Sequence, residues 1–328
     1  MPRCSIHLST SPTLVGIMGR RAAMNARKRR QRVLYGSLVV AVIALIVVFY
    51  LIYQAATVDP YSSYIGEPVS TGIIQDLTGV SNSTLSQVGV PSGVSSLTTL
   101  SGTLLTTNGA PEVLYVGGEF CPFCAVERWA IIVALSQFGT FTGLEYMQSS
   151  STDVNPNTPT FTFNGPSFSY TSKDLVFVPV EEYNRSEAVI QNLTTQQSSL
   201  LSQYDVCSSS STESSGGIPF VDIANIYGVT CGAQSSIVLS GENWTQVASK
   251  LNDPTSNVAQ QIDGAANTLI SAICAADHQA GITPTGPNGN VCSEPFASDL
   301  SFASPVAAYA PSSSLAAAPA YLDPRWTD

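Results

Sequence analysis

Three apolar patterns divide the 328-residue chain into segments with different expected structures. Residues 33–53 form an uncharged run of 21 residues, and a helix needs about 20 to cross a bilayer. Short runs rich in β-branched and aromatic residues predict strands at 97–105, 113–116, 144–148, 161–163, 175–180, 218–225 and 236–240. Apolar residues at helical spacing predict helices at 122–138, 186–204, 243–251 and 256–277.

The strands and helices alternate between residues 96 and 294. This order predicts an α/β domain in which a sheet carries helices on both faces. The segments around this domain have simpler compositions. We expect a basic head at 1–32, a loose stalk rich in Ser, Thr and Gly at 54–95, and a disordered tail rich in Ala, Ser and Pro at 295–328.

Charge is distributed unevenly along the chain. Eight of the 13 Lys and Arg residues precede position 33, whereas all 23 acidic residues follow it. The basic flank predicts a single-pass membrane protein with a cytoplasmic N-terminus and an external domain. The apolar run exceeds the roughly 7–15 residues of a signal peptide core, and residues 54–57 form a poor cleavage site, so an uncleaved anchor is favoured over a cleaved signal. The acidic remainder argues against nucleic-acid binding.

The cysteines fit an oxidising location. Cys4 lies in the head, and the other six of the seven cysteines lie in the predicted external domain. Four N-glycosylation sequons add weak support, because such triplets arise by chance in a chain rich in Ser and Thr: Asn82, Asn184, Asn192 and Asn243.

The most informative motif is Cys121-Pro122-Phe123-Cys124, between a predicted strand and a predicted helix. Two cysteines three residues apart in a first helical turn share one face, and the helix dipole favours the thiolate of the first. Pro122 suits the first helical position, where its missing N–H costs nothing. We therefore expect Cys121 to attack a disulfide and Cys124 to resolve the product.

Other roles for this motif are less favoured. A zinc site needs four ligands, but the domain has no second CxxC and His278 is its only histidine. A haem attachment would need histidine at position 125, where the chain has Ala125. A purely structural disulfide remains an alternative, although so short a loop contributes little stability. No metal and no cofactor is expected.

The order of strand, CPxC motif, helix and a later strand opened by proline resembles the thioredoxin fold, here with an inserted helix. The resemblance implies a cis proline beside the dithiol and a substrate peptide bound by its preceding residue. Ile218-Pro219 is the matching position, preferred over Thr158-Pro159 because it follows the long predicted helix. Pro122, Phe123, Ile218 and Pro219 are then the expected substrate contacts.

More narrowly, the block VLYVGGEFCPFCAVERWAIIVALSQFG resembles an archaeal family of membrane-anchored thioredoxin-like proteins, domain-of-unknown-function family 929, over roughly residues 95–294. One position departs from thioredoxins, which place a buried acid six residues before the first cysteine. Tyr115 occupies it here, so a thioredoxin-type reductase is disfavoured. Glu119 and Glu127 are nearby acids that sequence cannot place. We expect Trp129 in the core, and Glu127 with Arg128 on a helix flank, from which Arg128 could act on the site electrostatically.

The remaining external cysteines allow three pairings. We favour Cys274 with Cys292, which would tie the last helix to the segment after it, and Cys207 with Cys231, which would bracket the Pro219 strand. The alternative for Cys207 and Cys231 is a second dithiol that relays electrons.

Together these features predict a membrane-anchored thiol–disulfide oxidoreductase outside the cell, acting on exported cysteine-containing proteins. Formation or isomerisation of disulfides is favoured over reduction. The electron-transfer partner and the direction of electron flow do not follow from sequence. The competing hypothesis is a non-catalytic cell-surface binding module in which the disulfide is structural.

Overall fold

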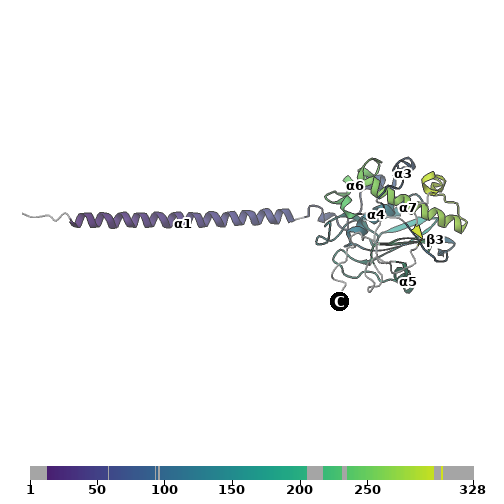
Figure 1. The fold of residues 1–328 in the computed structure, drawn as a ribbon, viewed down its shortest axis with the longest axis horizontal. Coiled ribbons are helices and arrows are strands. Elements are labelled where there is room, and N and C mark those ends of the chain that lie inside the picture. Colours follow the sequence, from purple (N-terminus) through teal and green to yellow (C-terminus); the bar gives the residue numbers. More distant parts are fainter. Residues whose placement is uncertain are drawn as a thin grey trace, which may run out of the picture. The chain divides into compact units, whose positions relative to one another are not determined.

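The computed structural model describes residues 13–57, 59–92, 94, 97–204, 217–230, 235–298 and 304–305. The chain divides into two units, 1–60 and 61–328, and each is described by itself. The first contains one uninterrupted helix, α1 (Thr13–Thr57), shown in Figure 1. Its segment Met24–Ile52 is long and apolar enough to cross a membrane, and its side chains are exposed.

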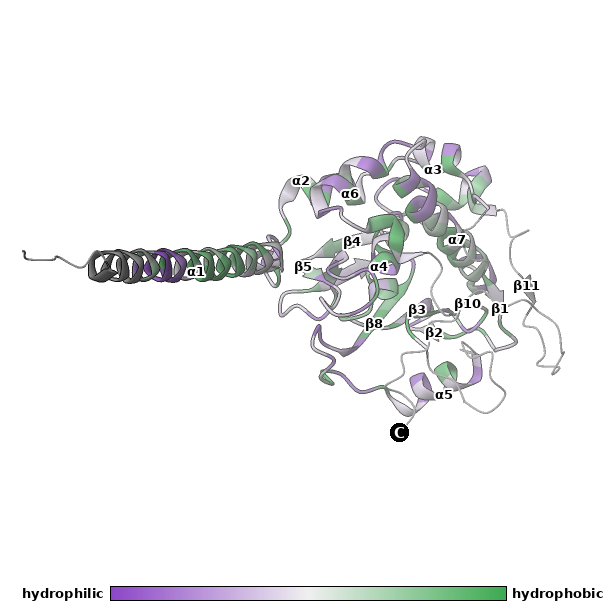
Figure 2. Cartoon of the chain, turned by 60° about the vertical axis from the view of Figure 1, so that its left-hand side comes forward, coloured by the Kyte–Doolittle hydropathy of each residue, from purple (hydrophilic) through white to green (hydrophobic). Residues whose placement is uncertain are grey.

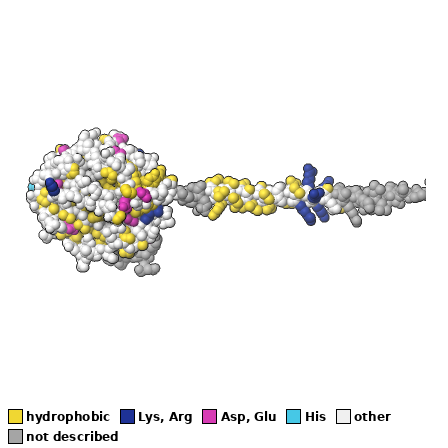
Figure 3. Space-filling model, turned by 180° about the vertical axis from the view of Figure 1, so that it is seen from behind, with side chains coloured by type: hydrophobic (Ala, Val, Ile, Leu, Met, Phe, Trp, Pro, Cys, Tyr) yellow, Lys and Arg dark blue, Asp and Glu magenta, His cyan; other side chains and the backbone are white. Residues whose placement is uncertain are grey.

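Helix α1 contains the predicted anchor at 33–53 and extends upstream of it to Thr13, into the predicted head. No proline interrupts that stretch, so the helix continues through it. Basic side chains gather on α1 just before its uncharged run at 33–53 (Figure 3). These are Arg27, Lys28, Arg29, Arg30 and Arg32.

The second unit is a mixed α/β domain built on one central sheet. Its strand order is β11-β1-β10-β9-β3-β2, and β8 also pairs with β3. The neighbours of β3 are β8, parallel to it, and β9 and β2, both antiparallel. The strand bounds are β1 (Thr98–Thr99), β2 (Thr106–Thr107), β3 (Ala110–Gly118), β8 (Val176–Tyr183), β9 (Phe220–Ile223), β10 (Tyr227–Val229) and β11 (Ser304–Pro305).

Helices cover both faces of this sheet, as predicted (Figure 2). On one face, α4 (Pro122–Leu135) and α7 (Asn257–Ala280) pack over Tyr115 and its neighbours in the main core. On the other face, α5 (Thr195–Tyr204) packs against Leu114, Val116 and Phe220. Successive residues of β3 therefore serve opposite cores, as the alternation of side chains along a strand requires.

Two small two-stranded sheets lie outside the central one. Strand β4 (Gly139–Thr142) pairs with β7 (Ser169–Ser172), and β5 (Glu145–Gln148) pairs with β6 (Pro159–Thr162). The predicted strands at 144–148 and 161–163 thus correspond to β5 and β6, but they pair with each other rather than joining the central sheet.

The prediction of a loose stalk at 54–95 is wrong for most of that segment. Residues 61–88 include α2 (Thr71–Thr78) and α3 (Asn82–Val88), whose apolar side chains are buried in the domain. The buried side chain of Asn267 on α7 donates to the carbonyls of Leu85 and Gly89 at 2.8 and 2.7 Å. The Ser and Thr content concealed the helical spacing of Ile73, Leu77, Leu85 and Val88.

Three other predicted segments also differ. The helix expected at 186–204 begins only at Thr195, because Asn184 Oδ1 accepts hydrogen bonds from the backbone of Ser186 and Ala188 and forms a turn. The strand expected at 236–240 is a 3₁₀ helix, η2 (Ser236–Leu239). The disordered tail was predicted to start at residue 295, which is too early, because η4 (Pro295–Ser298) packs against α7 and buries Phe296.

The last two helices occur where the apolar spacing predicts them, as α6 (Trp244–Leu251) and α7. A disulfide joins Cys274 of α7 to Cys292 of η3 (Val291–Ser293), which is the pairing we favoured. Cys207 and Cys231 lie outside the described residues.

Two of the four sequon asparagines already use their side-chain nitrogens, Nδ2, as hydrogen-bond donors within the domain. Asn82 Nδ2 donates to Glu294 Oε1 at 3.2 Å, and Asn243 Nδ2 donates to the Tyr61 hydroxyl at 3.1 Å while its oxygen caps α6. Asn192, by contrast, is exposed. A glycan on Asn82 or Asn243 would displace these hydrogen bonds.

Helix α7 carries a buried carboxyl group, Asp263, that yields a stability prediction. Among the described residues neither of its oxygens has a hydrogen-bond partner, and burial raises its pKa to about 8. Because an unfolded aspartate has a pKa of about 3.9, the unfolded chain ionises first, and stability falls as pH rises from about 4 to about 8.

We expect Asp263→Asn to increase the free energy of unfolding by about 1–3 kcal/mol at pH 8 and to leave it nearly unchanged at pH 4. Urea denaturation of the detergent-solubilised chain at both pH values measures this. Asp76→Asn, at an exposed position of α2, is the control and should change stability by less than about 0.5 kcal/mol. A loss of stability in Asp263→Asn at pH 8 would contradict the prediction.

Candidate functional site

Two glycines, Gly117 and Gly118, end β3 just before the dithiol at the start of α4. A Cβ on Gly117 would lie 2.0 Å from the Tyr115 hydroxyl, so only glycine lets that ring fold back over the backbone. A Cβ on Gly118 would lie 3.0 Å from the Phe120 ring and 3.1 Å from Ile218 Cδ1. The second glycine therefore allows the Ile218 segment to approach the junction closely.

Cys121 is the N-cap of α4, and Pro122 is its first helical residue. The backbone N–H of Cys124 donates to Cys121 Sγ at 3.3 Å, so the sulfur takes the place of a capping oxygen. Unpaired amides and the positive end of the helix dipole favour negative charge at this position. Both cysteines are free thiols.

The second contact of Cys121 comes from the segment before β9. Its thiol donates to the Ile218 carbonyl across 3.8 Å, and the Ile218–Pro219 peptide bond is cis. The alternative proline, Pro159, instead begins β6, and its carbonyl accepts a hydrogen bond from the Trp129 indole at 2.8 Å. Of the two candidate positions, 218–219 is the one whose contact with Cys121 the structure records.

An apolar rim surrounds the pair. Phe120, Phe123, Tyr183 and Ile218 pack with the two cysteines in one small cluster, and the Phe120 and Tyr183 rings meet edge to face at 6.0 Å. Cys121 is 5% exposed, whereas Cys124 is fully buried behind it. Phe123 and Ile218 are partly exposed, so an approaching molecule would meet them first.

The prediction that Glu127 and Arg128 lie on a helix flank is wrong, because both side chains are fully buried behind Cys124. Arg128 makes two hydrogen bonds to Glu181 of β8, from Nε at 2.8 Å and from Nη2 at 2.7 Å. Its guanidinium also lies 5.8 Å from the centroid of the Tyr115 ring. The sequence could not reveal this ion pair, since its partners are 53 residues apart. Trp129 is in the core, as expected.

The two thiols have opposite pKa shifts. Burial acts to raise the pKa of Cys121, but hydrogen bonds from the Cys124 thiol and backbone, the charge of Arg128 and the Phe123 amide together lower it below its ordinary value. Burial raises the pKa of Cys124 well above its ordinary value, and the adjoining Cys121 adds to the increase. Cys121 is therefore the thiol that ionises first.

The acids near the site have separate roles. Glu119 is buried, and its Oε1 accepts a hydrogen bond from Thr162 Oγ1 at 2.6 Å. Glu181 is paired with Arg128, although burial still raises its pKa. The Tyr115 hydroxyl has no hydrogen-bond partner among the described residues, and burial raises the pKa of Tyr115 well above its ordinary value.

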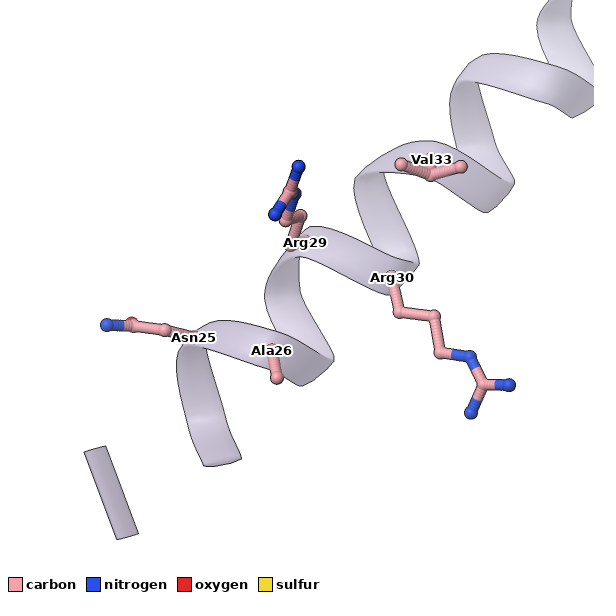
Figure 4. Close-up of a pocket in the computed structure, with 5 residues that line it drawn as sticks. All are labelled: Asn25, Ala26, Arg29, Arg30 and Val33. Atoms are coloured by element: carbon pink, nitrogen blue, oxygen red, sulfur yellow. The ribbon is translucent and has the colours of Figure 1, made fainter. Parts of the chain in front are cut away.

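Within the described part of the chain, no group of three His, Cys, Asp or Glu side chains could hold a metal ion. A shallow hollow lies elsewhere, on one side of α1, where it is bounded by Asn25, Ala26, Arg29, Arg30 and Val33 (Figure 4). It belongs to the first unit and is lined by two cationic side chains, Arg29 and Arg30.

Comparison with known protein families gives one match. A family model described as "Domain of unknown function (DUF929)" matches residues 96–275, a range that contains the dithiol, the ion pair and the cis proline. No curated protein and no solved structure matches the chain.

The opposite pKa shifts of Cys121 and Cys124 predict selective alkylation of Cys121 by iodoacetamide. We expect its rate to rise with pH around a midpoint below the ordinary thiol value of about 8.5, with Cys124 unmodified. Mass spectrometry of the native, detergent-solubilised chain locates the label, and the same chain in denaturant provides the reference midpoint. A native midpoint at or above that reference would contradict the prediction.

The unpaired Tyr115 hydroxyl yields a second prediction. We expect Tyr115→Phe to increase the free energy of unfolding by about 1 kcal/mol, because it removes a buried polar group that lacks a partner. The pH dependence of Cys121 alkylation should stay unchanged. Urea denaturation and the alkylation assay test both parts, and a shifted profile would instead identify the phenol as part of the thiol chemistry.

Proposed function

Because the chain belongs to the family described as "Domain of unknown function (DUF929)", which assigns no reaction, we propose its activity from the site itself. We propose that the protein is a membrane-anchored thiol–disulfide oxidoreductase that forms or isomerises disulfides in exported proteins. One observation carries the proposal: Cys121 caps α4 with its sulfur, beside the Ile218 carbonyl and in front of the buried Cys124.

This arrangement provides the two chemically distinct thiols that disulfide exchange requires. In the oxidising direction, a substrate thiolate attacks Cys121 Sγ of the Cys121–Cys124 disulfide, and Cys124 leaves as a thiolate. A second substrate thiolate then attacks the substrate sulfur of the mixed disulfide, and Cys121 leaves. The substrate gains a disulfide, while the protein takes up two electrons and keeps both cysteines reduced.

The proposed fold is thioredoxin-like with an inserted helix. Three features support it: β3 leads directly into the dithiol helix, β8 runs parallel to β3, and the antiparallel β9 follows the cis proline. Helix α5 between β8 and β9 corresponds to the expected inserted helix. In this arrangement the Ile218 backbone and the Phe123 side chain would contact the substrate peptide.

The proposed location is outside the cell, with the N-terminus in the cytoplasm. The basic residues before the apolar segment of α1 support this orientation. The Cys274–Cys292 disulfide supports an oxidising compartment, in which cysteine-containing exported proteins are the available substrates. An electron acceptor must then reoxidise Cys121 and Cys124 after each turnover.

One observation favours the alternative of a binding module with a structural disulfide. Cys121 is only 5% exposed, so little of this residue is accessible to a sulfur of another molecule. The oxidoreductase requires Cys121 to undergo thiol–disulfide exchange with cysteines of another molecule, whereas the binding module does not.

Trapping and turnover distinguish them. We expect the detergent-solubilised chain, in its disulfide form, to oxidise a reduced two-cysteine peptide. Cys121→Ser should lose all turnover. When the oxidised form of the peptide is offered instead, reduced Cys124→Ser should accumulate a mixed disulfide, because Cys121 attacks the peptide disulfide and the resolving thiol is gone. Mass spectrometry and thiol titration follow both outcomes.

Replacing both Cys274 and Cys292 by Ala is the matched control, since it removes a cysteine pair away from the site and should retain trapping. Absence of peptide oxidation and of any mixed disulfide would leave the binding module as the function. The reduction potential of the Cys121–Cys124 pair shows whether the protein oxidises or reduces its substrate. A value near −120 mV is typical of strong oxidants, and one well below about −250 mV would indicate reduction.

A further inference from the structure

A buried ion pair lies directly behind the candidate dithiol. Arg128 and Glu181 have side chains that are 0% and 1% exposed, and the guanidinium binds the carboxylate through two parallel hydrogen bonds. Removing two charges from water costs several kcal/mol per ion, and an apolar pair of similar volume is often at least as stable. Stability alone therefore does not explain why charges occupy this position.

The helix places Arg128 on the face that carries the thiols. Cys121, Cys124 and Arg128 are spaced three and four residues apart along α4, so they share one side of it. Glu181 is the residue opposite Gly117 in the parallel pairing of β3 and β8, at the end of the strand that leads to Cys121. The ion pair thus lies at the same end of the domain core as the dithiol.

The contacts of Arg128 leave part of its guanidinium unused. Nε and Nη2 bind Glu181, and the ring of Tyr115 lies 5.8 Å away, but Nη1 has no hydrogen-bond partner among the described residues. The charged and titratable groups that interact with it include Tyr115 on β3, Glu181 on β8, and Cys121 and Cys124 on its own helix, while Glu119 acts on Glu181. Glu127, the preceding residue of α4, is also fully buried. The guanidinium is the cation among these groups.

We propose that Arg128 is a positioning residue for disulfide exchange, whose charge stabilises the thiolates of Cys124 and Cys121, and that Glu181 holds the guanidinium in place and limits this effect. The inference rests on the proposed oxidoreductase function and deepens it. It explains how charge is handled at a site where Tyr115 replaces the acid of thioredoxins.

The charge acts at two defined moments. When a substrate thiolate attacks Cys121 Sγ, the Cys121–Cys124 bond breaks and its electron pair passes to Cys124 Sγ, which is buried and needs a nearby positive charge. When the second substrate thiolate attacks the mixed disulfide, the electron pair passes to Cys121 Sγ at the helix N-terminus. The protein's own disulfide is the oxidant in this single turnover, and the two substrate protons pass to solvent.

The thiol pKa values agree with this assignment. After burial and hydrogen bonding, the charge of Arg128 is among the causes that lower the pKa of Cys121, and it opposes the increase that burial produces at Cys124. Stabilising thiolates stabilises the reduced form, and that makes a dithiol a stronger oxidant.

Two variants test the proposal through changes of opposite sign. Glu181→Gln keeps the cation and removes the anion, so the thiolate fraction of Cys121 at a fixed pH should rise. Combining Arg128→Met with Glu181→Gln removes the cation without leaving an unpaired carboxylate, so that fraction should fall below the wild-type value. The ultraviolet absorbance of the thiolate in the detergent-solubilised full chain measures both.

The equilibrium with reduced and oxidised glutathione provides the second readout. We expect the equilibrium constants of these two variants to differ by roughly tenfold, which is about 30 mV for a two-electron couple. Lys250→Met combined with Glu242→Gln is the matched control, because it removes a partly exposed ion pair of α6 and should change neither readout.

If Glu181→Gln changes neither the thiolate fraction of Cys121 nor the equilibrium with glutathione, the proposal is overturned. This variant is nearly isosteric, so it tests the proposal even if the double variant does not fold. A purely structural ion pair would lower stability in both variants without shifting the thiolate fraction in opposite directions. Failure of the proposed function is separate: the wild-type chain itself would then not exchange its Cys121–Cys124 pair with reduced and oxidised glutathione.

Discussion

The near-complete burial of α4 is the constraint on which the rest of the domain depends. Thirteen of its 14 residues are buried, including the charged Glu127 and Arg128, so only its N-terminal end approaches solvent. Helix α7 covers one side and the central sheet another. A helix enclosed in this way must satisfy its charges inside the core, and Arg128 does so through Glu181 on β8. The one end left near the surface carries the dithiol.

The close packing around α4 also fixes the position of the Cys121 sulfur. A Cβ at Gly117 would collide with the Tyr115 side chain, and a Cβ at Gly118 would make unusually tight contacts with Phe120 and Ile218. The Cys121 sulfur is then held between two backbone groups, the Cys124 amide of its own helical turn and the carbonyl of Ile218, which lies 97 residues after Cys121 in the chain. The position of the thiol therefore depends on the packing of β9 against β3 as much as on the local turn.

Local patterns predicted the parts of the structure that depend on neighbouring residues. The spacing of Cys121 and Cys124 before an apolar helix was enough to predict the N-cap geometry, and helical spacing predicted α6 and α7. Long-range packing was not predictable. The Arg128–Glu181 pair and the docking of α2 and α3 depend on contacts between distant segments, and the short Asn184 turn outcompeted the helix expected there. The resemblance, rather than any local pattern, placed the cis bond at Ile218–Pro219.

A buried cation, Arg128, lies behind the dithiol, and its sign has a chemical consequence. A buried acid beside a resolving thiol accepts its proton, so it assists a dithiol that must attack. A buried cation instead stabilises a thiolate once it has formed, and so it assists cysteines that must leave. Under the proposed function, the lowered pKa of Cys121, to which the charge of Arg128 contributes, favours the reduced form, although burial raises the pKa of Cys124. Such a dithiol accepts electrons readily, which favours disulfide formation over reduction as the direction of the proposed reaction.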